Sequence, residues 1–100
     1  MRVEFRSKKI EKCFLDSSKA VREWGGSIAR RYIQRINILQ AAKTLNDLNS
    51  LPGLKCHPLK GNRAGQFAVK LDGAWRLIFS IEGDVLKIIC ILEVSRHYDD

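Results

Sequence analysis

The sequence predicts an α+β fold, with helices in the amino-terminal half and antiparallel strands in the carboxy-terminal half. Two observations support this prediction: apolar residues recur every three or four positions up to residue 48, and they alternate with polar residues from residue 67 onward. A chain of 100 residues suits one compact domain, residues 1–100. We expect the element order β-α-α-β-β-β.

The first elements are a short strand and a helix. Val3 and Phe5 alternate with charged neighbours, as in a strand. The apolar residues that follow at nearly helical spacing are Ile10, Cys13, Phe14, Val21 and Trp24. The polar residues 16–18 can interrupt this helix, and Gly25 and Gly26 end it.

A second helix is expected to begin at Ser27, a candidate N-cap whose hydroxyl can accept a hydrogen bond from the next turn. One apolar stripe follows, formed by Ile28, Tyr32, Ile36, Leu39, Ala42, Leu45 and Leu48. The cations that mostly flank or oppose this stripe are Arg30, Arg31, Arg35 and Lys43. This pattern predicts one amphipathic helix with a solvated basic face, closed by Pro52 and Gly53.

Three alternating segments predict an antiparallel meander. Their apolar sets are Phe67, Val69 and Leu71, then Trp75, Leu77, Phe79 and Ile81, then Leu86, Ile88, Cys90 and Leu92. Turn residues separate the segments at 72–73 and 83–84. A strict two-residue loop at the first turn would place the first two apolar sets on opposite faces, so we expect a three-residue connection or a bulge there. The resulting pairs are Leu71 with Trp75, Val69 with Leu77, and Phe67 with Phe79.

The same register sets Lys70 opposite Arg76 on the face away from the helices. Like charges in a cross-strand pair disfavour folding unless an anion or an acidic partner neutralises them, so we interpret this face as a ligand-binding face. The alternative is that both side chains extend into solvent at little cost. Ile78, Ile89 and Ile91 would share this face under a two-residue second turn, and we expect the tail or a partner to cover them.

The charge balance favours a polyanionic or acidic ligand. Lys and Arg total 18 against 11 acidic residues, a formal charge of +7. Between residues 50 and 80 the only acid is Asp72, and the cations are Lys55, Lys60, Arg63, Lys70 and Arg76. Nucleic acid is therefore the leading partner class.

Cysteine usage and hydropathy favour the cytoplasm. Cys13, Cys56 and Cys90 are widely spaced and odd in number, which indicates neither a disulfide framework nor a zinc site. No metal or other cofactor is expected. Residues 1–12 lack an apolar signal-peptide region, and no apolar run approaches the ~20 residues of a membrane span.

Several residues suit metal-independent RNA cleavage, in which the 2'-hydroxyl attacks the adjacent phosphate. His57 can exchange a proton near neutral pH, Lys60 can hold the phosphate, and Arg76 can bind it bidentately. Tyr98 or His97 can supply a second proton-transfer group or stack on a base.

Lys55, Arg63 and Lys70 are candidates for RNA binding, and the helical arginines for contact with ribosomal RNA. Each assignment has a structural alternative. His57 precedes a proline and suits an ordinary loop, and Tyr98 lies in a terminal tail, where fraying is common.

The chain resembles the HigB branch of the RelE/ParE toxin superfamily, the plasmid-maintenance killer proteins. The resemblance rests on the motifs Leu-Pro-Gly, His-Pro-Leu-Lys-Gly, Gly-Gln-Phe and Gly-Ala-Trp-Arg-Leu-Ile-Phe. The resemblance covers roughly residues 45–99. It implies two amino-terminal helices packed on a small antiparallel sheet, and a toxin that cleaves messenger RNA in the ribosomal A site. It also implies a HigA-like antitoxin whose helix-turn-helix portion binds operator DNA. From the hydropathy alone, no membrane partner is expected.

The family's site positions carry over to His57, Lys60, Arg76 and Tyr98. The tail His97-Tyr98-Asp99 departs from the Asp-Tyr-His ending of some members, which leaves the second proton-transfer group open. One alternative is a ParE-like toxin that inhibits DNA gyrase without cleaving RNA. Another is a basic nucleic-acid-binding module, which would tolerate loss of His57 or Tyr98.

Overall fold

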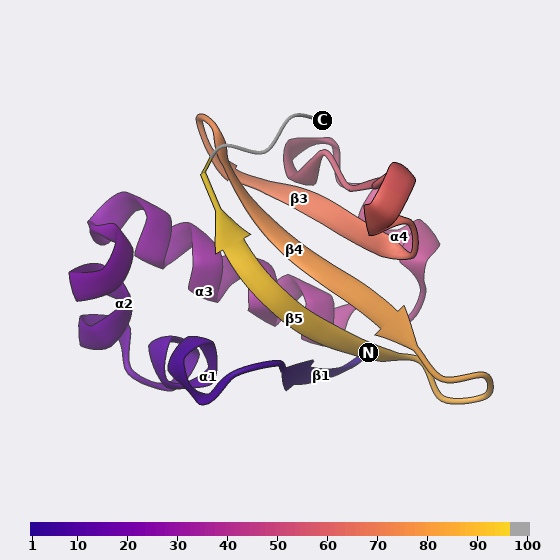
Figure 1. The fold of residues 1–100 in the computed structure, drawn as a ribbon, viewed down its shortest axis with the longest axis horizontal. Coiled ribbons are helices and arrows are strands. Elements are labelled where there is room, and N and C mark those ends of the chain that lie inside the picture. Colours follow the sequence, from indigo (N-terminus) through magenta and orange to yellow (C-terminus); the bar gives the residue numbers. More distant parts are fainter. Residues whose placement is uncertain (97–100) are drawn as a thin grey trace.

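A computed structural model of the protein describes residues 1–96, so His97 and Tyr98 lie outside the described residues. The helices are α1 (Lys8–Leu15), α2 (Ser17–Trp24), α3 (Gly26–Ala41) and α4 (Leu45–Asn49), with short 3₁₀ turns at Pro52–Leu54 and Gly61–Arg63. The strands are β1 (Arg2–Phe5), β2 (His57–Pro58), β3 (Gln66–Asp72), β4 (Trp75–Glu82) and β5 (Ile88–Ser95). The predicted α+β class is confirmed (Figure 1).

The strands form one sheet in the order β1-β5-β4-β3-β2, and α3 crosses behind β4 and β5 in Figure 1. Strands β3 to β5 form the expected antiparallel meander, the unpredicted β2 pairs antiparallel with β3, and β1 pairs parallel with β5. The sheet is therefore mixed. No helix within residues 1–96 is long and apolar enough to cross a membrane.

The first predicted helix is two helices that meet at Asp16. Asp16 ends α1, and its side chain caps α2 by accepting a hydrogen bond from the Ser18 amide at 3.0 Å. Ser27 is not an N-cap, because Gly25, with a φ of 85°, holds the cap position of α3. The Ser27 hydroxyl instead donates to Asp72 Oδ2 at 3.0 Å.

The predicted second helix also breaks, because α3 ends at Ala41 and α4 begins after Thr44. Thr44 and Asp47 form a capping box, in which the Thr44 hydroxyl accepts from the Asp47 amide and the Asp47 carboxylate accepts from the Thr44 amide. This local polar network competes with continuation of α3. The apolar stripe survives the break, since Leu48 is fully buried.

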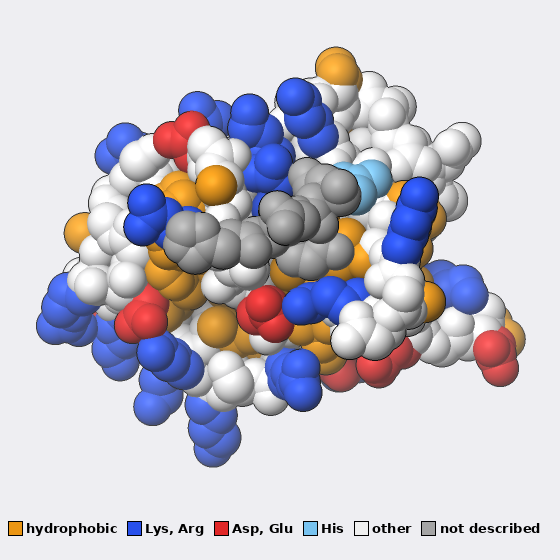
Figure 2. Space-filling model, turned by 45° about the horizontal axis from the view of Figure 1, so that its top comes forward, with side chains coloured by type: hydrophobic (Ala, Val, Ile, Leu, Met, Phe, Trp, Pro, Cys, Tyr) orange, Lys and Arg blue, Asp and Glu red, His pale blue; other side chains and the backbone are white. Residues whose placement is uncertain are grey.

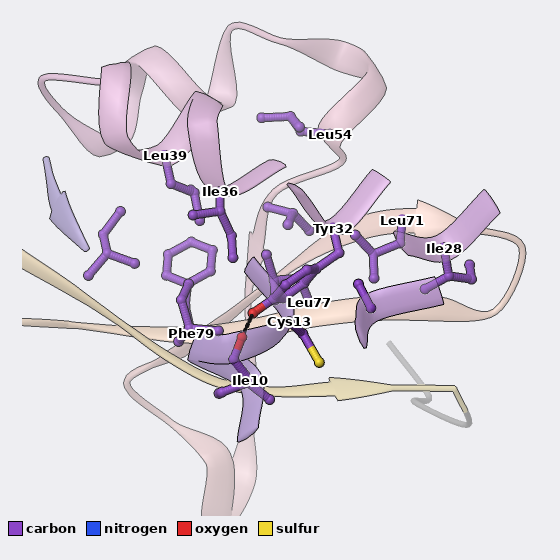
Figure 3. Packing of buried hydrophobic residues seen from close by; sticks show 14 of the residues in the cluster. Ile10, Cys13, Ile28, Tyr32, Ile36, Leu39, Leu54, Leu71, Leu77 and Phe79 are labelled. Atoms are coloured by element: carbon purple, nitrogen blue, oxygen red, sulfur yellow. Dashed lines mark hydrogen bonds between the residues drawn. The ribbon is translucent and has the colours of Figure 1, made fainter. Parts of the chain in front are cut away.

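The main core lies between the helices and one face of the sheet (Figure 3). The buried Tyr32 hydroxyl donates to the Ile10 carbonyl at 2.5 Å and so ties α3 to α1. Burial raises the pKa of Tyr32 well above its ordinary value. The largest fully buried side chains are Tyr32, Phe79, Ile36, Leu39, Leu48, Leu77, Ile78, Ile89, Ile91 and Val69.

The predicted register between β3 and β4 is confirmed for three pairs, which are Phe67 with Phe79, Val69 with Leu77, and Lys70 with Arg76. The expected bulge lies between Lys70 and Asp72. One pair differs from the prediction, because Asp72 rather than Leu71 is the partner of Trp75. Leu71 remains buried at the bulge.

The prediction placed the side chains of the last strand on the wrong faces of the sheet. Ile89 and Ile91 lie in the main core, because β5 begins at Ile88 and the connection from β4 is longer than two residues. Leu86, predicted as a strand residue, is exposed in that connection. Ile78 does face away from the helices, as predicted.

Ile78 is covered by the protein itself. It packs with Leu59, Ala68 and the partly buried Leu92 in a second, smaller apolar cluster. Leu92 reaches this cluster because the pairing of β4 and β5 shifts between Ile78 and Phe79.

Candidate functional site

The side of the sheet turned away from α1–α3, called the second face below, carries the candidate site. Its residues on β2 to β4 include His57, Ala68, Lys70, Arg76 and Ile78, because alternate residues of a strand share a face. Two cross-strand rows define the geometry. His57 pairs with Ala68, and the next second-face row joins Lys70 to Arg76.

His57 enters this face from β2, a strand of two residues that the sequence did not reveal. The preceding Lys55 adopts a left-handed conformation with a φ of 48°, and its carbonyl lies 2.8 Å from His57 Nδ1. Because a carbonyl oxygen can only accept, Nδ1 carries the proton of the neutral ring. Nε2 is then the nitrogen of the neutral ring that carries no proton, and this atom is buried in the structure.

Arg76 leaves β4 on the second face and is half-buried. Its Nη1 donates to the Gly73 carbonyl at 2.7 Å and to the Trp75 carbonyl at 3.0 Å, so the guanidinium lies against the β3–β4 turn. A planar guanidinium offers five N–H donors, an arrangement that suits a phosphate. Lys70, also half-buried, stands opposite Arg76 and concentrates positive charge there.

Arg63 makes two contacts on the second face that the sequence did not indicate. Its Nε donates to Gln66 Oε1 at 3.0 Å, and its Nη2 lies 3.4 Å from Glu93 Oε2. Sequence reasoning missed both partners. Glu93 pairs with Ile78 in the sheet, and only the register shift in β5 places it there. Composition alone therefore offered no signal for Glu93.

Lys55 and Lys60 lie at the border of the second face. Lys55 is exposed beside His57, and Lys60 is exposed at the start of the Gly61–Arg63 turn. Leu59 anchors this loop by packing on Ala68 and Ile78, and its amide donates to the Gln66 carbonyl at 2.9 Å. In Figure 2, Lys and Arg side chains gather around a histidine on this side of the molecule.

The roles assigned to His97 and Tyr98 remain predictions, because both lie outside the described residues. Within residues 1–96, no group of three or more His, Cys, Asp or Glu side chains is arranged to hold a metal ion. Cys13, Cys56 and Cys90 are free thiols, and burial raises the pKa of Cys56 to about 11. Cys56 is therefore poorly suited to act as a thiolate nucleophile.

The chain matches one protein-family model over residues 3–93, described as the RelE-like toxin of the type II toxin-antitoxin system HigB. The match includes the amino-terminal half, where no sequence motif indicated the family. Toxin HigB-1 of Vibrio cholerae serotype O1 is 33% identical over 88 residues, which cover 87% of this chain and 92% of the relative.

Solved structures share the fold at low sequence identity. YafQ from Escherichia coli BL21(DE3) has a TM-score of 0.61 at 15% identity, covering 96% of this chain and 93% of its own. A YoeB/ParE toxin from Agrobacterium tumefaciens has a TM-score of 0.60 at 17% identity, covering 98% and 100%. The YoeB dimer from Staphylococcus aureus has a TM-score of 0.56 at 19% identity, covering 98% of each chain.

Proposed function

The chain belongs to the HigB-like toxins of type II toxin-antitoxin systems, and from that membership we propose that it is a ribosome-dependent endoribonuclease. The observation that carries the proposal is the second face, where His57, Lys70 and Arg76 lie on neighbouring strands. A proton-exchanging group beside two cations is the arrangement that phosphodiester cleavage needs.

In the proposed reaction, the 2'-hydroxyl of the substrate attacks the adjacent phosphorus. His57 Nε2 takes the hydroxyl proton, the O2'–P bond forms and the P–O5' bond breaks. Tyr98 or His97 donates a proton to the departing O5', which leaves a 2',3'-cyclic phosphate and a free 5'-hydroxyl. No metal ion enters these steps.

Arg76 and Lys70 stabilise the negative charge that grows on the phosphate oxygens during the attack. Lys60 assists from the border of the second face, and Lys55 and Arg63 bind the flanking RNA backbone. The pair of Lys70 and Arg76 suits this role, because an anion bound between them removes their mutual repulsion.

The ribosome supplies the messenger RNA in its A site, and the toxin therefore acts in the bacterial cytoplasm. Membership of a type II system also implies a cognate antitoxin. We assign to it a HigA-like helix-turn-helix portion that carries any contact with operator DNA. The charge of +7 favours rapid association with an acidic antitoxin segment at low salt.

The test is primer extension on a short messenger programmed into purified ribosomes, with chelator present throughout. The wild-type protein is expected to make a discrete cut in the A site, and the Arg76→Ala variant is expected to leave the messenger intact. Intact messenger in every lane would refute the nuclease and favour a gyrase-directed or purely binding toxin. Equal cutting by the variant would remove Arg76 from the mechanism.

A further inference from the structure

Arg35 on α3 is the one buried charged side chain within residues 1–96, with 8% of its surface exposed. Its Nε donates to the Lys70 carbonyl at 3.0 Å, and its Nη1 donates to Gln34 Oε1 at 3.0 Å. Burial and the nearby Arg31 lower its pKa. Both acceptors are neutral, so these contacts only partly offset the cost of burying the charge, and stability alone does not explain its place.

The Lys70 carbonyl, which accepts from Arg35 Nε, lies at the edge of the bulge, because Lys70 is the last β3 residue before it. Asp72, on the other side of the bulge, accepts a hydrogen bond from the Ser27 hydroxyl at 3.0 Å. Ser27 and Arg35 stand eight residues apart on α3, which is two turns and about 80° around the helix, so both lie within the broad stripe that faces the sheet. Helix α3 therefore holds both ends of the bulge.

The bulge connects directly to the second face. Lys70 pairs with Arg76, and Asp72 pairs with Trp75. The Trp75 carbonyl accepts from Arg76 Nη1, as does the Gly73 carbonyl of the same turn. A displacement of the bulge therefore moves both the backbone of Lys70 and the carbonyls against which the Arg76 guanidinium rests.

We propose that Arg35 is a positioning residue for the second face, and that Ser27 assists it. Arg35 contacts the sheet from the helix side, so it acts on the RNA-cleaving groups only through the Lys70 carbonyl and the bulge. The buried core, which includes Val69 and Leu77, already fixes the strand register. Within that register, Arg35 adjusts the positions of Lys70 and Arg76, and an error of ~1 Å in such positions can cost up to ~100-fold in rate.

This inference rests on the proposed ribonuclease function, and its first test measures cleavage kinetics on programmed ribosomes. The variants are Arg35→Gln and Ser27→Ala, with Lys12→Gln as the control, because Lys12 is an exposed cation on α1. Arg35→Gln is expected to lower kcat about tenfold with KM nearly unchanged, and Ser27→Ala to lower it less. A wild-type kcat for Arg35→Gln, or a loss confined to KM, overturns the inference.

A double-mutant comparison shows whether Arg35 acts through Arg76. If it does, Arg35→Gln costs less rate in an Arg76→Lys background than in the wild type. Independent, multiplicative losses overturn the proposed route. Ser27→Ala provides a second perturbation if Arg35→Gln proves unstable, because Ser27 is exposed.

A readout independent of cleavage separates this inference from the proposed function. In nuclear magnetic resonance spectra, Arg35→Gln is expected to shift the Arg76 Nε–H and Gly73 amide resonances, whereas Lys12→Gln leaves them in place. If the wild-type protein cuts no messenger, the ribonuclease proposal fails, and shifted resonances still support the mechanical coupling. Unmoved Arg76 and Gly73 resonances overturn the coupling, whatever the cleavage result.

Discussion

Arg76 and Leu77 are neighbours in sequence but face opposite sides of β4, so their alanine variants should fail in different ways. Arg76→Ala is expected to lose most of its cleavage activity and retain the fold, because its side chain leaves the sheet on the second face. Leu77→Ala is expected to lose stability, because Leu77 is fully buried in the main core. The two variants form a matched pair in one strand.

The magnitudes follow from the contacts. Arg76 donates to two turn carbonyls, at 2.7 Å and 3.0 Å, in a partly exposed setting where water can replace it. Removing it should lower the free energy of unfolding by about 1 kcal/mol, partly offset by relief of repulsion with Lys70. That loss corresponds to roughly 4–8 °C in Tm for a domain of this size. Leu77→Ala should cost about 2–5 kcal/mol.

The assay combines urea denaturation, followed by tryptophan fluorescence, with messenger cleavage measured on the same preparations. Trp24 and Trp75 are partly buried and report unfolding. Arg76→Ala is expected to lower kcat by about 10²–10³-fold, the usual cost of removing one group that stabilises transition-state charge. A stability loss for Arg76→Ala as large as that of Leu77→Ala would falsify the reasoning, since Arg76 would then be a structural residue.

Three further predictions concern single side chains. His57→Ala should weaken cleavage more than ribosome binding measured by co-sedimentation, and equal losses would make His57 a binding residue. Tyr32→Phe should lower the free energy of unfolding in urea by about 1–2 kcal/mol, because its buried hydroxyl donates to a carbonyl of α1, and an unchanged midpoint would contradict this. Backbone amides lower the pKa of Asp47, so its ionised form stabilises the fold and that contribution disappears as the pH falls below about 3.8. Asp47→Asn should therefore flatten the acid limb of a Tm profile, and an unaltered slope there would exclude this role.

Much of the fold was predictable because periodicity and turn chemistry are local properties. Most of the helical and strand segments, the interruption at residues 16–18 and the register shift at the first turn were anticipated, whereas the two-residue strand β2 was not. The failures have local physical causes too. The capping box of Thr44 and Asp47 divides the second helix, and the long connection before Ile88 reverses the facing of β5.

The candidate site was predictable in part. Lys70 and Arg76 stand opposite each other on the second face, as the register indicated, and His57 lies on that face as well. Sequence reasoning did not find Glu93 or the contact of Arg35 with the Lys70 carbonyl. It treated Arg35 as part of a solvated helix face, yet this side chain is buried.

The α+β class, the basic character and the toxin family could be predicted from periodicity, charge and sequence motifs. Each of these depends only on residue types and short spacings. The facing of β5 and the partners of Arg35 and Arg63 depend on bulges and loop lengths that long-range packing selects. Strand side chains alternate with a period of two, so a shift of one residue moves a side chain to the opposite face. Only the assembled sheet decides such shifts, and they determine which charges meet on the second face.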